Sequence, residues 1–212
     1  MTGVAHFDRR IFLDVNAFSR HTGWLHTPVT DFAKYGVVLF GLLLVIGLLH
    51  SRRGTAGTLA AAVWAAIGVL IAVGVNQLVV HAVHRARPYT GHPSVLVLVA
   101  RSADLSFPSD HAVMAGATAT GLVLVWRRLG LIAAVAAAVM AFARVYVGAH
   151  YPGDVVAGLI LGAVVAGLGW LLVRVPLTRA AGWLRSRAVL DRLLVDRATG
   201  DAGTAHRSGV TS

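Results

Sequence analysis

The sequence predicts an all-α integral membrane protein, a bundle of about five transmembrane helices preceded by an N-terminal interfacial helix. Of the 212 residues, 57% are hydrophobic and only 13% are charged, where soluble domains carry roughly a quarter charged residues. Several apolar runs also approach the ~20 residues that cross a bilayer. The formal net charge of +10 suits nucleic acid or an anionic membrane surface. The apolar content favours the membrane, so we expect no nucleic-acid partner.

The N-terminal segment, residues 1–34, is too polar to cross the bilayer. It contains Asp14, Asn16, Arg20 and Asp31 within a short stretch. Its apolar residues recur at helical spacing, and they could form one face of a helix lying in the membrane interface. That face would consist of Phe7, Ile11, Phe12, Val15, Phe18 and Trp24.

Five apolar stretches follow within residues 35–174, which we expect to form the transmembrane domain. They cover residues 35–49, 54–80, 112–126, 129–143 and 155–173. The second stretch has no charged residue. The shorter stretches continue into polar ends whose long side chains can reach the interface.

Residues 175–212 are predicted to form a basic cytoplasmic tail. Over residues 178–195, apolar side chains such as Trp183 lie among arginines, which suits a surface helix on anionic lipid. From Thr199 onward small and polar residues predominate, and this composition predicts disorder.

The arginines of the loops indicate how the bundle is oriented. With five spans, the pairs at 52–53 and 127–128 lie on the same side as the basic tail. The positive-inside rule makes this side cytoplasmic. We therefore expect a multi-pass plasma-membrane protein whose other loops face the extracytoplasmic side.

Three polar clusters lie in those other loops. Residues 84–88 read His-Arg-Ala-Arg-Pro, residues 107–111 read Phe-Pro-Ser-Asp-His, and the third cluster runs from Arg144 to Asp154. Because the five spans bring all three clusters to one face, we expect them to build a single site at the membrane surface.

The residue types in these clusters suit binding of a phosphate group. Arg87 and Arg144 carry permanent charge on a planar fork that matches phosphate oxygens. Ser109 and Asp110 lie where a helix begins, and the unpaired backbone N–H groups there favour an anion.

Two histidines add the chemistry of phosphoryl transfer. His150 and Asp154 are four residues apart, so a helix starting near residue 152 turns the carboxylate back toward the imidazole. His111 opens the third apolar run. Charge neutralisation, an oriented nucleophile and a leaving-group acid are what phosphoryl transfer through histidine requires.

Each part also has an ordinary structural interpretation. Arg87 could be an interfacial arginine, Ser109 and Asp110 a plain helix cap, and Arg144 a structural ion-pair partner of Asp154. The prediction therefore depends on the coincidence of all three clusters on one face. The sequence has no cysteine and no carboxylate cluster, so we expect neither a metal site nor a cofactor.

These clusters resemble the three-part signature of the type 2 phosphatidic acid phosphatase (PAP2) superfamily of membrane lipid phosphatases. The signature reads Lys-x6-Arg-Pro, Pro-Ser-Gly-His and Ser-Arg-x5-His-x3-Asp. Here its parts appear as Arg87-Pro88, as residues 108–111 and as Arg144-x5-His150-x3-Asp154. Ser-Asp-His in the second part, with Asn76-Gln77 in the preceding span, is similar to the bacterial undecaprenyl-diphosphatase branch.

The resemblance implies a six-helix PAP2-like core and a role for each site residue. His150 would be the nucleophile, Asp154 would orient and stabilise it, and His111 would protonate the leaving oxygen and then activate water. Phosphate-binding residues would be Arg87, Ser109, Asp110 through its backbone N–H, and Arg144.

Two positions depart from the signature. Val80 occupies the position of the first lysine, with His81 beside it, and Ala143 replaces the serine before Arg144. Arg85 is the expected substitute for the missing cation.

The expected function is hydrolysis of undecaprenyl or another polyprenyl diphosphate to the monophosphate, through a phosphohistidine, for recycling of a carrier lipid in cell-wall synthesis. The partners are then the lipid phosphate substrate and the bilayer. Phosphatidate or phosphatidylglycerol phosphate is the alternative substrate. A catalytically weakened lipid-binding scaffold is the alternative to an enzyme. The sequence does not indicate an oligomeric state.

Overall fold

The structure is a computed structural model that describes residues 3–207, with side chains described for residues 3 and 5–187. Over this range it contains helices and loops but no strand, which confirms the predicted all-α class. The elements are α1 (Gly3–His21), η1 (Gly23–Leu25), α2 (His26–Ser51), α3 (Ala56–Val83), α4 (Pro88–Gly91), α5 (Asp110–Val125), α6 (Arg127–Tyr146) and α7 (Pro152–Arg207).

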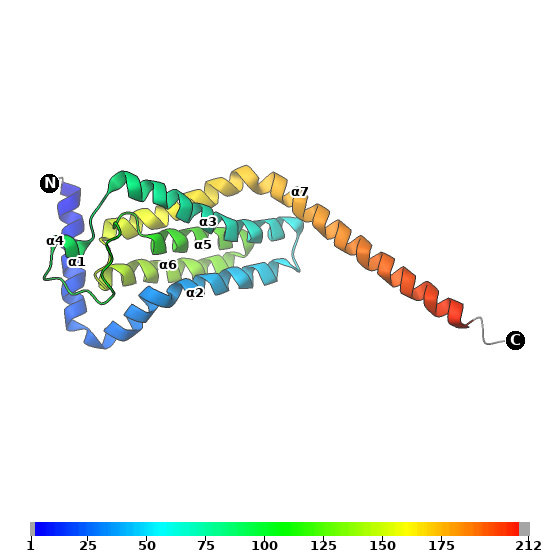
Figure 1. The fold of residues 1–212 in the computed structure, drawn as a ribbon, viewed down its shortest axis with the longest axis horizontal. Coiled ribbons are helices and arrows are strands. Elements are labelled where there is room, and N and C mark those ends of the chain that lie inside the picture. Colours follow the sequence, from blue (N-terminus) through cyan, green and yellow to red (C-terminus); the bar gives the residue numbers. More distant parts are fainter. Residues whose placement is uncertain (1–2, 208–212) are drawn as a thin grey trace.

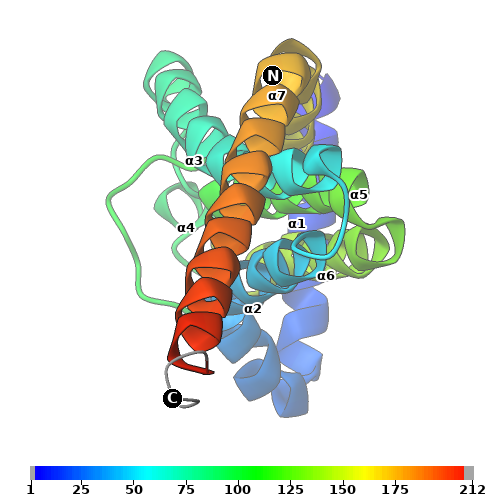
Figure 2. The same cartoon turned by 90° about the vertical axis from the view of Figure 1, so that its right-hand side faces the viewer.

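Helix α5 is the centre of the bundle. It packs against α3, α6 and α7 and also contacts α2, so that the other helices enclose it (Figures 1 and 2). Small residues make this close packing possible: a Cβ at Gly162 of α7 would collide with the carbonyl oxygen of Val113 in α5. Small residues serve this purpose in membrane bundles, where backbones approach closely.

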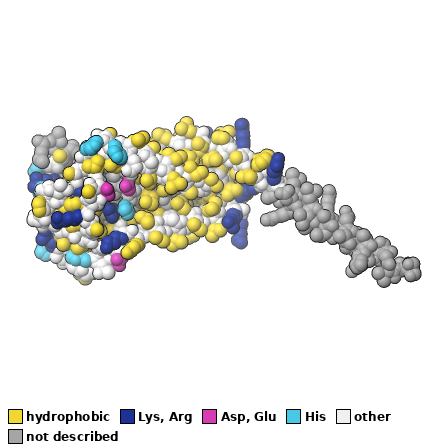
Figure 3. Space-filling view, viewed as in Figure 1, with side chains coloured by type: hydrophobic (Ala, Val, Ile, Leu, Met, Phe, Trp, Pro, Cys, Tyr) yellow, Lys and Arg dark blue, Asp and Glu magenta, His cyan; other side chains and the backbone are white. Residues whose placement is uncertain are grey.

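Four helical stretches are long and apolar enough to cross a membrane, namely Gly23–Ser51, Ala56–Gly91, Arg127–Tyr146 and Pro152–Arg187. The remaining predicted span, residues 112–126, corresponds to α5, which has 16 residues and is therefore about 24 Å long. It begins at Asp110, directly after the loop that carries the second polar cluster. Figure 3 shows the apolar side chains as a broad belt, with basic side chains at both ends of the belt.

Helix α1 lies across one end of the bundle (Figure 1). The residues of its predicted apolar face do not share one environment: Phe12 is fully buried, whereas Phe7 and Phe18 are exposed. The side chain of Asn16 is buried, donating to the carbonyl of Leu96 at 2.8 Å and accepting its N–H at 3.1 Å. Helix α1 thus contacts the loops of the bundle through polar side chains, whereas the sequence predicted only an apolar contact with the membrane interface.

The first span begins earlier than predicted. Helix α2 starts at His26, not at residue 35. His26 is joined to the preceding turn, because its Nε2 lies 2.8 Å from the carbonyl oxygen of Ser19. The polar residues after His26 are therefore part of a helix that extends past the apolar belt toward α1.

Helix α7 does not end at the predicted boundary after residue 174 but continues as one helix to Arg207, and the division into a transmembrane domain and a tail stays a prediction. Arg185 fastens this helix to the α2–α3 loop by donating to the carbonyl of Ser51 at 2.8 Å and to that of Gly54. The helix also includes residues 199–207, where the sequence predicts disorder. Residues 208–212 lie outside the described part of the chain.

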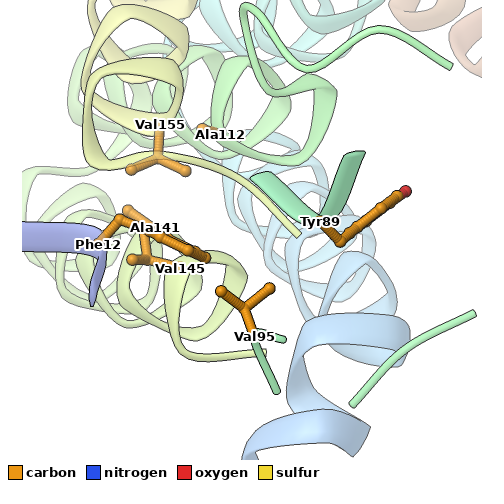
Figure 4. Packing of buried hydrophobic residues seen from close by; sticks show 7 residues of the cluster. All are labelled: Phe12, Tyr89, Val95, Ala112, Ala141, Val145 and Val155. Carbon is orange, nitrogen blue, oxygen red and sulfur yellow. The ribbon is translucent and has the colours of Figure 1, made fainter. Parts of the chain in front are cut away.

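A buried apolar cluster holds together the elements that carry the polar clusters (Figure 4). Three of its members, Ala112, Val145 and Val155, are direct neighbours of site residues in the sequence. Burial of these side chains against α1 and the 84–109 region fixes the backbone beside each polar group. The full cluster is Phe12, Tyr89, Val95, Ala112, Ala141, Val145 and Val155.

Candidate active site

The three polar clusters of the sequence meet in one cavity of about 760 Å³. Its wall includes Arg87 from the first cluster, Asp110 and His111 from the second, and Arg144 and His150 from the third. The two imidazoles therefore share one cavity. Figure 3 shows basic, acidic and histidine side chains gathered at the end of the molecule that carries α1.

His150 is 3% exposed and is held by one ring nitrogen. Its Nδ1 lies 2.8 Å from the carbonyl oxygen of Ser106. Because a carbonyl can only accept, Nδ1 carries the hydrogen, and Nε2 of the neutral ring has its lone pair available. The loop before α7 presents this nitrogen to the cavity.

Burial lowers the pKa of His150 below its usual value, and the Arg144 and Arg87 guanidiniums lower it further. The neighbouring Asp154 carboxylate acts in the opposite direction. The net direction favours the neutral ring near pH 7, which is the form that can act as a nucleophile.

Two guanidiniums face the free nitrogen of His150. Arg87 Nη1 and Arg144 Nη2 each lie 3.4 Å from His150 Nε2. Arg87 is anchored by the carbonyl oxygen of Asp104 at 3.0 Å, and Arg144 by that of Ala33 at 3.2 Å. The Nε of Arg144 is buried without a hydrogen-bond partner, so this side chain retains donor capacity.

Asp154 is fully buried at the start of α7, which begins at Pro152 as the sequence predicts. Its Oδ2 lies 3.8 Å from His150 Nδ1, an ion-pair distance that is too long for a hydrogen bond. The same oxygen accepts from the hydroxyl of Ser106 and from the Tyr151 N–H at 2.8 Å. Asp154 therefore acts on His150 through its charge and through Ser106.

The start of α5 reaches the cavity through Asp110 and His111, whereas Ser109 is not part of the cavity wall. Ser109 takes the N-cap position, yet its side chain makes no capping bond, and its buried hydroxyl has no partner. Asp110 is held by α3, since its Oδ1 accepts from Asn76 Nδ2 at 2.6 Å and Gln77 Nε2 at 3.0 Å. The carboxylate is thereby fixed at the helix start, where the backbone N–H groups of the first turn have no partner in the helix.

Arg85, the expected substitute for the missing cation, lies behind the cavity wall and contacts two carboxylates. Its two Nη atoms donate to Asp154 Oδ1 at 2.7 Å and to Asp8 Oδ2 at 2.6 Å, and its guanidinium lies 4.2 Å from the Tyr151 ring centre. It does not line the cavity. Arg85 pairs with the carboxylates behind His150 and is not placed to bind phosphate.

Asp8 and Ser106 belong to this network, and the sequence analysis missed both. Asp8 on α1 accepts from the N–H of Gly153 at 2.7 Å, which joins α1 to the start of α7. The two residues are 145 positions apart, so no local pattern could reveal the contact. Ser106 lies just before the second cluster, and its backbone carbonyl and its hydroxyl contact His150 and Asp154 respectively.

Lys34 of α2 and His81 of α3 also line the cavity, at positions the sequence analysis did not include. His81 Nδ1 lies 2.6 Å from the carbonyl oxygen of Gln77, so its Nε2 is the free nitrogen. Among the described residues, no three His, Cys, Asp or Glu side chains come together in a way that could hold a metal ion.

Comparison with known proteins gives the family and the fold that this chain resembles. The sequence profile of the PAP2 superfamily matches residues 61–176, which include all three clusters. Undecaprenyl-diphosphatase BcrC of Bacillus subtilis is 29% identical over 165 residues, which are 77% of this chain and 81% of that protein. Decaprenylphosphoryl-5-phosphoribose phosphatase of Mycobacterium tuberculosis is 38% identical over 136 residues, covering 63% of this chain and 69% of that protein.

A solved structure shows the same arrangement of helices. The PAP2 type phosphatidylglycerolphosphate phosphatase from Bacillus subtilis superposes with a TM-score of 0.58 at 23% identity. The match covers 79% of this chain and 85% of that structure. At this identity the likeness supports the fold alone.

Proposed function

The chain belongs to the PAP2 superfamily, and from this premise we propose that it removes the terminal phosphate of a polyprenyl diphosphate, such as undecaprenyl or decaprenyl diphosphate. The products are the polyprenyl monophosphate and inorganic phosphate, so the reaction would regenerate a carrier lipid for cell-wall synthesis. One observation carries the proposal: Nε2 of the buried His150 faces two guanidiniums across 3.4 Å, while Nδ1 is bonded to a carbonyl.

In the proposed first step, His150 Nε2 attacks the terminal phosphorus. A nitrogen–phosphorus bond forms, and the bond from phosphorus to the bridging oxygen breaks with its electron pair on that oxygen. Arg87 and Arg144 neutralise the oxygens of the transferred group. Asp154, 3.8 Å from Nδ1, stabilises the positive charge that the ring acquires.

His111 is the proposed acid and base. It lines the same cavity at the start of α5, so it can donate a proton to the departing bridging oxygen. The neutral His111 then removes a proton from water, which attacks the phosphohistidine and releases phosphate. The first-turn amides of α5 bind the phosphate group through both steps. The predicted contribution of Ser109 requires its buried, unpartnered hydroxyl to reach the cavity, whose wall does not include it.

The preference for a polyprenyl diphosphate is drawn from the relatives and from the cavity. BcrC, which the chain matches over most of its length, is named for undecaprenyl diphosphate. A cavity of about 760 Å³ can accept a diphosphate head group while the tail stays in lipid. We place the site on the extracytoplasmic face of the plasma membrane, opposite the end that carries the arginine pairs 52–53 and 127–128.

A second candidate substrate is a polyprenyl-phosphate sugar that carries a terminal phosphomonoester. The 38% identity to the mycobacterial decaprenylphosphoryl-5-phosphoribose phosphatase favours it. Phosphatidate and phosphatidylglycerol phosphate are the other lipid phosphates to compare. All of these share the transferred phosphate and differ in the leaving group.

Phosphate release by the purified protein in detergent micelles tests the proposal. We expect undecaprenyl diphosphate to give a kcat/KM well above that of phosphatidate, and His150→Ala to abolish release. Comparable turnover of phosphatidate would refute the prenyl assignment. Unchanged release by His150→Ala would refute the nucleophile, and a folded wild-type protein without phosphatase activity would favour the scaffold alternative.

A further inference from the structure

Lys34 lines the same cavity as His150, Arg87 and Arg144. It is the only lysine in the sequence, and it lies in the apolar stretch Gly23–Ser51 of the first span. The side chain is exposed and lies near the polar start of α2, beyond the apolar belt. None of the ion pairs among the described residues includes Lys34. Its charge is therefore available to a ligand in the cavity.

The backbone of α2 holds Lys34 close to the reaction centre. The carbonyl oxygen of the preceding residue, Ala33, accepts from Arg144 Nη1 at 3.2 Å, and Nη2 of the same guanidinium lies beside His150 Nε2. His81 and Gln77 of α3 line the cavity as well. At this end of the bundle α2 and α3 lie on opposite edges (Figure 1), so Lys34 and His81 approach the cavity from different sides.

The cations at this end of the bundle differ in what they contact. Arg87 and Arg144 both face Nε2 of His150, where the transferred phosphate must lie. Arg85 is paired with Asp8 and Asp154 outside the cavity. Within the described part of the chain, Lys34 is thus the one Lys or Arg of the cavity wall that does not contact His150.

We infer that Lys34 binds the inner phosphate of a diphosphate substrate, the one that leaves with the lipid. This inference rests on the proposed function. When the bond from the terminal phosphorus to the bridging oxygen breaks, the electron pair stays on the bridging oxygen, and negative charge on the inner phosphate increases. A cation beside that phosphate stabilises the transition state more than the ground state. A phosphomonoester of a lipid alcohol has no second phosphate, so Lys34 favours diphosphates over such esters.

Binding of inorganic ions tests the contact apart from catalysis. His150→Ala protein is titrated with inorganic diphosphate and with inorganic phosphate, and thermal stabilisation reports the affinity of each. We expect Lys34→Gln in this background to weaken diphosphate binding about tenfold, the loss of one charge-assisted contact. Phosphate binding should change less than about threefold. The inference would be overturned if Lys34→Gln weakened the binding of both ions equally, or if it weakened the binding of neither ion.

Turnover tests the same contact in the active protein. For Lys34→Gln we expect kcat/KM to fall about tenfold on undecaprenyl diphosphate, with phosphatidate hydrolysis nearly unchanged. Lys34→Arg keeps the charge and should recover most of the loss. Arg10→Gln removes a cation from exposed α1 at the same end of the molecule and serves as the charge-matched control. An equal loss on both substrates, or a similar loss in Arg10→Gln, would contradict the inference.

The two sets of results separate this inference from the proposed function. If the wild-type protein hydrolyses lipid phosphates and Lys34→Gln shows no diphosphate-specific loss, the inference fails and the proposed function stands. If no lipid phosphate is hydrolysed, the proposed function fails, and the titration of inorganic ions still decides whether Lys34 binds a second phosphate.

Discussion

Asp154→Asn tests how the network behind His150 acts on the reaction. The carboxylate is fully buried, and its two oxygens accept from Arg85 Nη1, the Ser106 hydroxyl and the Tyr151 N–H. An amide keeps one acceptor oxygen and replaces the other with a donor. The variant therefore loses the negative charge beside His150 and leaves at least one buried donor without its partner.

The structure gives the size of the charge effect. Asp154 Oδ2 and His150 Nδ1 are 3.8 Å apart. For unit charges at this separation, an effective dielectric constant of about 20 gives about 4 kcal/mol. Because the ring carries only part of a charge in the transition state, we expect kcat to fall about 100- to 1000-fold.

Phosphate release at saturating undecaprenyl diphosphate measures this loss, and a thermal melt verifies folding. Ser106→Ala is the matched control, because it removes one donor to Asp154 but keeps the charge and the backbone carbonyl that holds His150 Nδ1. It should cost only about tenfold, the value of one hydrogen bond to a charged group. An Asp154→Asn rate within about tenfold of wild type, or equal losses in both variants, would refute the charge argument.

Three further predictions concern the same site. Because the pKa of His150 is lowered, protonation should inactivate the protein only below the usual pH range of histidine titration. In a plot of kcat/KM against pH, the midpoint of the acidic limb should therefore lie below 6.5. A midpoint above that value would contradict a buried neutral ring. Asp8→Asn weakens the contacts of α1 with Arg85 and Gly153 and should lower both kcat and the melting temperature, whereas an unchanged kcat would show that α1 does not position the site. Chelation by EDTA should leave the rate unchanged, and strong inhibition that added metal reverses would indicate a metal site.

The fold was largely predictable because apolar runs report directly on membrane spans. The prediction was least accurate where a helix leaves the apolar belt. Helix α2 starts at His26 because its polar first turns reach α1 and the cavity, and hydropathy treats such residues as a loop. Helix α7 passes the predicted end of the last span because Arg185 fastens it to the α2–α3 loop. Contacts of this kind depend on tertiary structure, which composition does not encode.

For the site as for the fold, the sequence indicated what depends on local spacing and missed what depends on tertiary contacts. The sequence could single out His150, Asp154, Arg144 and Arg87 as candidates because each lies in a compact cluster with fixed spacing. The pairing of Arg85 with Asp8 could not be predicted, because Asp8 is 77 residues away on α1. Lys34 was missed for a similar reason: it lies alone in an apolar run, and only the folded bundle brings it to the cavity.

The central claim is that His150 becomes phosphorylated during the reaction. To test it directly, the protein is mixed with undecaprenyl diphosphate labelled at the terminal phosphorus, the reaction is quenched rapidly without acid, and the labelled peptide is mapped. The account predicts a transient, acid-labile label on the peptide containing His150 that is absent from His150→Ala. Phosphate release without any labelled protein, or a label on another residue, would contradict it.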